Sequence, residues 1–114
     1  MRFNQGDIWM ADLNPGFGTE PGKVRPVVIV QTDLLNKEHN SVIICPISAQ
    51  VFEDFYQLRI HLNKRNSGLE KRSDILVDQI RSIDLRRMRR KIGAVTTEVL
   101  DELKNQLKNI LDIP

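Results

Sequence analysis

Short apolar segments bounded by turn residues recur through most of the chain. The segment ending at Leu62 is the clearest, because Leu58, Ile60 and Leu62 alternate with polar residues, as in a strand with one face in water. On that alternation His61 points to the wet face, opposite Ile60 and Leu62. The pattern predicts strands over 8–13, 26–31, 42–48 and 58–62, a fifth candidate over 75–83 and a short sixth over 92–95.

The hydrophobic period changes near the end of the chain, after a capping threonine at 96 or 97. Spacings of three and four separate the apolar residues Val99, Leu100, Leu103, Leu107, Ile110 and Leu111. This pattern predicts a terminal amphipathic helix. Single helical turns are predicted at 33–36 and 84–88. We therefore expect a mainly β fold with a C-terminal helix, in which five or six short strands close into a small barrel.

Length and composition limit the class of protein. The chain has 114 residues, of which 40% are hydrophobic and 28% charged, as expected of one folded domain over 1–114. No apolar run approaches the roughly 20 residues of a membrane span, and no apolar leader is visible, so we expect a cytoplasmic protein without a membrane partner. With one cysteine, Cys45, and two histidines, neither a disulfide nor a structural metal site is expected.

The distribution of charge is more informative than the net charge of +2. Six basic residues and one acid lie within 81–91, whereas 98–112 holds four acids and two bases. The basic segment at 86–91 has two interpretations that the sequence alone leaves open. Clustered arginines neutralise phosphates in nucleic-acid contacts, but they are equally common in solvated turns.

Glycine and proline are dense between the first two predicted strands, over 14–22. The spacing is not that of a phosphate-binding Walker loop, since Lys23 is followed by Val24 and not by serine or threonine. A plain connecting loop is one interpretation and a lid over a site is the other. Arg25 follows this loop and needs an anionic partner, either a carboxylate such as Glu20 or a phosphate.

Four segments, taken in order, resemble the MazF/PemK family of toxin endoribonucleases: 6–9 (GDIW), 24–28 (VRPVV), 45–48 (CPIS) and 77–84 (VDQIRSID). The resemblance covers nearly the whole chain. It implies an SH3-like barrel of the MazF/PemK/CcdB type and a homodimeric toxin that cuts single-stranded RNA without a metal or other cofactor. It also implies a small MazE-like antitoxin as partner.

The resemblance also assigns roles to individual residues. Arg25 matches the family's catalytic arginine, and Ser48 matches a catalytic hydroxyl residue that is more often threonine. Glu20 is the one nearby carboxylate that we nominate as a base. The loop after the first strand is implied to close over RNA. The resemblance implies RNA contacts from Phe17, Glu20, Gln79 and neighbouring positions. We expect the residues that bind RNA to be Phe17, Lys23, Asn36, Gln79 and Arg81, since Phe17 can stack on a base and Asn36 and Gln79 can read base edges.

Two other functions remain as alternatives. A toxin of the related CcdB type shares the barrel and poisons DNA gyrase without needing the pair Arg25 and Ser48. A non-catalytic RNA-binding barrel would depend on Arg81 and the basic segment at 86–91, and its binding would fall steeply with salt. Cleavage of RNA distinguishes the nuclease from both.

Overall fold

The computed structural model describes residues 2–51 and 58–114. The strand predicted at 58–62 begins at the first described residue after this gap. The elements are β1 (Asp7–Asp12), β2 (Val24–Ile29), α1 (Asp33–Asn36), β3 (Ser41–Ser48), β4 (Arg59–Leu62), α2 (Lys64–Ser67), β5 (Ser73–Leu76), the 3-10 turn η1 (Val77–Gln79), β6 (Arg81–Asp84), the 3-10 turn η2 (Leu85–Arg87), β7 (Met88–Ala94) and α3 (Thr97–Ile110).

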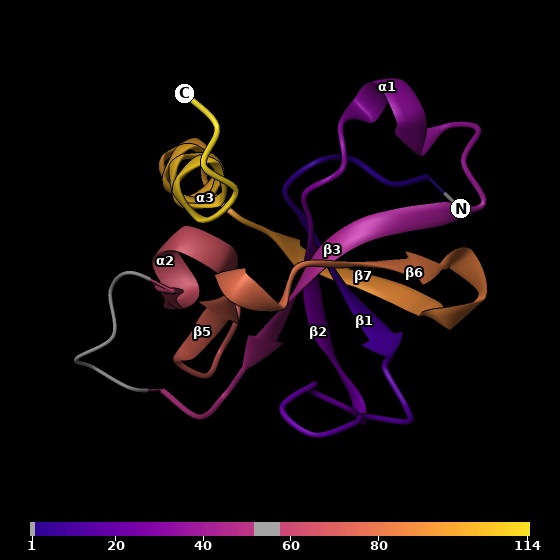
Figure 1. Cartoon of the computed structure of the whole chain (residues 1–114). Coiled ribbons are helices and arrows are strands. Elements are labelled where there is room, and N and C mark those ends of the chain that lie inside the picture. Colours follow the sequence, from indigo (N-terminus) through magenta and orange to yellow (C-terminus); the bar gives the residue numbers. More distant parts are fainter. Residues whose placement is uncertain (1, 52–57) are drawn as a thin grey trace.

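All strand pairings are antiparallel, and the strands follow the order β4-β5-β3-β2-β1-β7, with β6 also paired to β3 (Figure 1). The predicted fold class, mainly β with a C-terminal helix, is confirmed. In the described part of the chain, no backbone ladder joins β4 to β7, so the strongly curved sheet does not close fully into a barrel. Because β1 pairs with β7, the first and last strands of the chain lie side by side.

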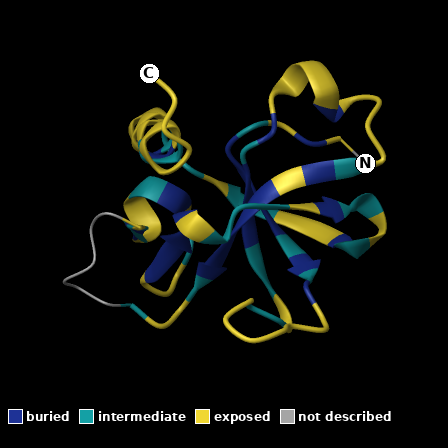
Figure 2. Ribbon diagram, viewed as in Figure 1, coloured by how far each residue is buried: buried dark blue, intermediate teal, exposed yellow. Residues whose placement is uncertain are grey.

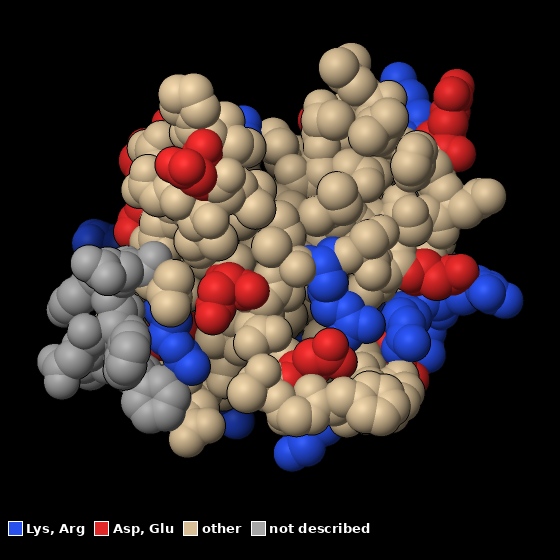
Figure 3. All heavy atoms as spheres, viewed as in Figure 1, with Lys and Arg blue, Asp and Glu red and all other residues tan. Residues whose placement is uncertain are grey.

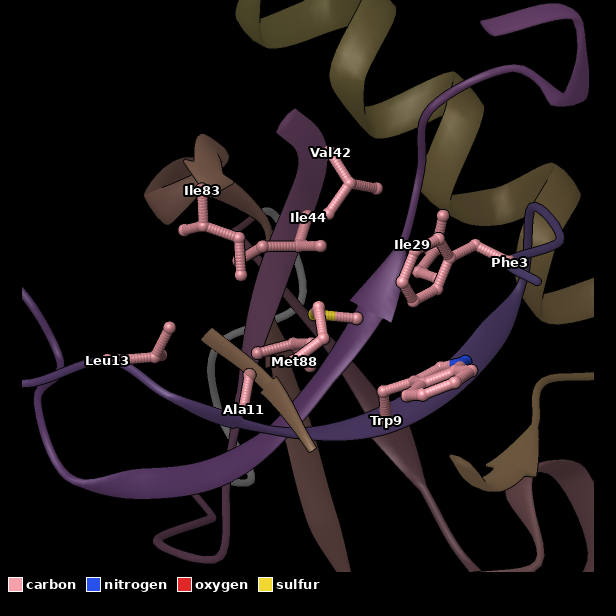
Figure 4. Packing of buried hydrophobic residues seen from close by; sticks show 10 residues of the cluster. Phe3, Trp9, Ala11, Leu13, Ile29, Val42, Ile44, Ile83 and Met88 are labelled. Carbon is pink, nitrogen blue, oxygen red and sulfur yellow. The ribbon is translucent and has the colours of Figure 1, made fainter. Parts of the chain in front are cut away.

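Two hydrophobic clusters occupy opposite faces of the curved sheet, because side chains alternate along each strand. The inner cluster includes Trp9, Val27, Ile44 and Ile83, and Figure 4 shows Trp9, Ile44 and Ile83 within the curve of the strands. The helix-side cluster contains Ile8, Val28, Cys45, Ile47, Ile60, Leu62, Ile75, Val77, Val99 and Leu103. Burial in this second cluster raises the pKa of the Cys45 thiol to about 12, so the thiol stays protonated at neutral pH.

The terminal helix α3 forms where the period of three and four predicts it. Thr96 caps its first turn, with the hydroxyl accepting from the Val99 amide, and Glu98 places a negative charge at the positive end of the helix. Val99 and Leu103 are buried against the sheet, while the opposite side of α3 is exposed (Figure 2). Among the described residues, no helix is long and apolar enough to cross a membrane.

Three local features differ from the sequence prediction. The strand predicted at 75–83 is split into β5 and β6 by the turn η1. The short strand predicted at 92–95 is instead β7, which begins earlier, at Met88. The helix α2 was not predicted, although Asn63 and Asn66 form a reciprocal capping box at its start. The single turns at 33–36 and 84–88 are present as α1 and η2.

Candidate active site

Arg25 lies near the start of β2 and Ser48 at the end of the neighbouring strand β3. The β2–β3 register pairs Val27 with Pro46, and the same register, continued by two positions, places Arg25 opposite Ser48. Directly opposed residues on antiparallel strands have their Cβ atoms about 5 Å apart and on the same face. That face is the one with the inner cluster, since Arg25 alternates in phase with Val27. The pair thus forms a polar continuation of the inner apolar face.

The Arg25 guanidinium is half-buried and is oriented from one side only. Its Nε donates to the carbonyl oxygen of Gly22 at 2.8 Å. Within residues 2–51 and 58–114, its two terminal nitrogens have no hydrogen-bond or ion-pair partner, and no ion pair joins Arg25 to Glu20. A fixed guanidinium with both outer nitrogens available can bind a phosphate with two parallel hydrogen bonds.

The Ser48 hydroxyl is oriented by a hydrogen bond from the backbone that follows it. Its Oγ accepts a hydrogen bond from the Gln50 amide at 3.1 Å, as in the serine turns that often end strands. Because that contact uses a lone pair of the oxygen, the hydroxyl proton remains able to donate to a second group. Ser48 therefore offers a donor on the face of the sheet to which the continued register assigns Arg25.

The β1–β2 loop rises from strands that meet closely at its base. Leu13 donates its amide to the Lys23 carbonyl at 2.9 Å, and the Asn14 side chain accepts from the Lys23 amide at 2.8 Å. The backbones of Gly16 and Gly22 pack so tightly that a Cβ on Gly16 would lie 2.9 Å from the Gly22 amide nitrogen. The two ends of the loop thus lie close together beside Arg25. The side chains of Phe17, Glu20 and Lys23 on this loop are exposed.

Two arginines of the basic segment hold the start of this loop. Arg87 donates to the carbonyl oxygens of Asp12 at 3.0 Å and Asn14 at 2.6 Å, and Arg89 lies 3.4 Å from an Asp12 carboxylate oxygen. The Asn14 amide donates to Asp12, and this bond, with the two arginines, lowers the pKa of the Asp12 carboxyl. In Figure 3 basic atoms gather over the β6–β7 turn. Two arginines of the basic segment therefore hold the loop in place. Neither a nucleic-acid contact nor a solvated turn, the two interpretations of this segment from the sequence, includes this role.

Arg81, Gln79 and Asn36 lie in different surroundings. Arg81 begins β6 opposite Ile44, on the inner face, and its buried Nη1 has no hydrogen-bond partner in the described part of the chain. Gln79 ends the turn η1 just before it and is half-buried. Asn36 is buried, and its side-chain amide forms hydrogen bonds with Gln31 and Asp33. The structure thus brings Arg81 toward the face of Arg25 and Ser48, whereas Asn36 is engaged inside the α1 turn.

A buried acid that the sequence analysis did not assign lies next to Ser48. Asp74 in β5 is fully buried and is paired directly with Ser48 on one side and with His61 on the other. Its carboxylate contacts His61 Nδ1 at 2.6 Å and Arg59 Nη1 at 3.0 Å. His61 is therefore only partly a wet-face residue. A charged residue in a strand whose other residues are all buried is the sequence signal for such a cluster.

The fold is shared with solved structures. The curved sheet superposes on a MazF crystal structure from Deinococcus radiodurans with a TM-score of 0.83, at 22% identity and 98% coverage of both chains. It also resembles a mycobacterial endoribonuclease in complex with its cognate antitoxin, with a TM-score of 0.76, 15% identity, and coverage of 98% of this chain and 95% of that one. The fold is therefore that of the MazF toxins.

Sequence comparison places the chain in a family. Residues 4–111 match the family described as PemK-like, MazF-like toxin of type II toxin-antitoxin system. The chain is 34% identical over 108 residues to endoribonuclease EndoA of Bacillus subtilis strain 168, which covers 95% of this chain and 93% of that protein. The chain belongs to the PemK-like, MazF-like toxin family of type II toxin-antitoxin systems.

Proposed function

We propose that this toxin is a sequence-specific endoribonuclease that cleaves single-stranded messenger RNA without a metal and thereby stops growth. The observation that supports this most directly is the identity of 34% to an endoribonuclease over 95% of the chain. The register of β2 and β3, continued by two positions, puts Arg25 and Ser48 on one face of the sheet, which supports a joint role for the two residues. The reaction takes place in the cytoplasm, where messenger RNA is found.

The chemistry uses a nucleophile that RNA itself provides. The 2′-oxygen attacks the adjacent phosphorus and loses its proton to a base, the bond from phosphorus to the 5′-oxygen breaks, and that oxygen gains a proton. The products are a 2′,3′-cyclic phosphate and a 5′-hydroxyl, and DNA is spared because it lacks the 2′-hydroxyl. Negative charge develops on the two non-bridging oxygens, where fixed donors stabilise the transition state.

The free donors at the site match this requirement. The outer nitrogens of Arg25 bind the non-bridging oxygens, and the Ser48 hydroxyl donates to the same group. A guanidinium keeps its proton at neutral pH and is a poor base, so Arg25 acts as a source of positive charge and as an acid toward the leaving oxygen. Glu20, exposed on the adjoining loop, is the carboxylate that we propose as base.

RNA bases need surfaces for stacking and for hydrogen bonding. We propose that Phe17, whose side chain is 71% exposed, stacks on a base, and that Lys23, Gln79 and Arg81 contact the strand. Asn36 is left to its structural role in α1. The active form is a homodimer, and a MazE-like antitoxin displaces RNA from this surface. A solved relative is itself described as an endoribonuclease in complex with its cognate antitoxin, which supports that partner.

The test is incubation of the purified protein with a long single-stranded RNA in EDTA, followed by mapping of the cut sites and of the new ends. We expect discrete cuts at one short sequence, with cyclic phosphate and 5′-hydroxyl termini. Intact RNA with a folded, antitoxin-free protein contradicts the proposal. Salt-sensitive RNA binding without cleavage then supports the RNA-binding alternative, and inhibition of gyrase supports the CcdB-like one.

The residue at 48 provides a graded test of the hydroxyl. We expect Ser48→Thr to cleave RNA at a rate near that of the wild type, because the donor is kept. We expect Ser48→Ala to be about 10²-fold slower, because one preorganised donor to the transition state is lost. Single-turnover rates on an oligonucleotide with a mapped cut site measure both variants. Equal rates for serine and alanine remove Ser48 from the mechanism.

A further inference from the structure

The strand β3 ends at Ser48, so the backbone after it is no longer held by the sheet. The last pairing of β3 with β5 joins Ser48 to Asp74, and Ala49 and Gln50 beyond it are exposed. The Ser48 hydroxyl accepts its hydrogen bond from the Gln50 amide, within this exposed stretch. The direction of the hydroxyl therefore depends on whatever fixes the backbone at Gln50.

Arg59 of β4 supplies that contact. Its Nη1 donates to the Gln50 carbonyl oxygen at 2.9 Å and to Asp74 Oδ2 at 3.0 Å. The other carboxylate oxygen, Asp74 Oδ1, lies 2.6 Å from His61 Nδ1. The contacts thus form a continuous path. It runs from the buried Asp74 carboxylate through the Arg59 guanidinium to the Gln50 carbonyl, and from the Gln50 amide to the Ser48 hydroxyl.

A stabilising role alone is a weak explanation for this cluster. Asp74 is fully buried, and the attraction within a buried ion pair is largely offset by the loss of hydration of its charges. Replacing a buried ion pair with apolar residues of similar volume is often neutral or stabilising, so stability alone does not require this pair. What the ion pair adds is direction, because a bridging guanidinium held by a buried carboxylate has little freedom to move.

We propose that Arg59 and Asp74 are positioning residues that orient the Ser48 hydroxyl toward the phosphoryl group bound at Arg25, with His61 holding the far side of the carboxylate. This inference rests on the proposed nuclease function. It distinguishes these residues from Arg25 and Ser48, which touch the substrate. Since the network acts on the direction of a transition-state donor, its loss lowers kcat and leaves KM nearly unchanged.

The test is steady-state cleavage of an oligonucleotide with a mapped cut site. We expect kcat to fall about tenfold in Arg59→Ala and in Asp74→Asn, with KM within about twofold of the wild type. We expect Arg59→Lys to recover part of the rate, because an ammonium can still donate to Gln50. The Arg59 side chain is only 19% exposed and its loss takes a cation away from the buried Asp74 carboxylate, so circular dichroism checks the folding of each variant. Arg59→Lys, which keeps a cation beside Asp74, tests the inference even if Arg59→Ala or Asp74→Asn folds poorly.

A double-mutant cycle separates positioning from general stabilisation. If Arg59 acts through the hydroxyl, Arg59→Ala changes the rate of the Ser48→Ala protein by less than about twofold. A full tenfold loss in that background, or an unchanged kcat in both single variants of an active enzyme, overturns the inference alone. Glu70→Gln, in an exposed ion pair with Lys64, is the matched control and leaves kcat unchanged. Absence of cleavage by the wild type overturns the proposed function as well.

Discussion

We expect the Arg25→Ala variant to fold normally and to cleave RNA about 10³-fold more slowly than the wild type. The side chain is half-buried near a strand end, and its one hydrogen bond in the described part of the chain is with the Gly22 carbonyl, so little of the fold depends on it. The transition state, in contrast, loses the guanidinium that stabilises its non-bridging oxygens, and removing such a donor costs about 10²- to 10³-fold. Single-turnover cleavage, with circular dichroism to check folding, measures the effect.

The matched control is Arg65→Ala, which removes the same side chain from the exposed surface of α2. We expect its rate to equal that of the wild type, so that a change in net charge is excluded as the cause. If Arg25→Ala cleaves RNA at the wild-type rate, the assignment of Arg25 to the active site is wrong. Inhibition of gyrase that persists in this variant, without RNA cleavage in either protein, supports the CcdB-like alternative.

The second large effect concerns stability. We expect Leu103→Ala to lower the free energy of unfolding by about 3 kcal/mol, because it opens a cavity beneath α3 where the leucine side chain is fully buried. For a domain of this size, the melting temperature then falls by about 15 °C. Thermal and urea unfolding followed by circular dichroism measure both quantities.

Leu34→Ala is the control for this change, since the same side chain is 90% exposed in α1. We expect its free energy of unfolding to stay within about 0.5 kcal/mol of the wild type. If Leu103→Ala unfolds at the same temperature as Leu34→Ala, the packing of α3 on the sheet contributes little to stability. The comparison tests the position of the terminal helix independently of any activity.

The elements that the sequence predicts well are those whose pattern is local. Leu103 and its neighbours in α3 repeat at three and four residues and follow a capping threonine, so both the type and the start of the helix are readable. The strand β7 is different, because its exposed residues Arg89, Arg90 and Lys91 show no alternation. That strand forms by pairing with β1, with two register shifts, and such long-range pairing leaves no local pattern.

The candidate site divides in the same way. The β2–β3 register, continued by two positions, puts Arg25 and Ser48 on one face, and the roles of both residues stay predictions until they are measured. Asn36 has the chemistry of a base reader, but its burial within the α1 turn depends on Gln31 and Asp33 folding around it. Asp74 gave a readable signal, an acid in a buried strand, yet only the β3–β5 pairing shows that its neighbour is Ser48.

The pairing of β1 with β7 has a consequence for how the toxin is made. The strand β1 pairs with β2 on one side, and its other side is completed only by β7, which follows all the other strands in sequence. Met88 of β7 and Leu103 of α3 also complete the two hydrophobic clusters. A growing polypeptide that stops before this strand leaves an open sheet edge and exposed apolar surface. We therefore expect a polypeptide that stops before β7 to remain unfolded and inactive, and not to act as a toxin of reduced activity.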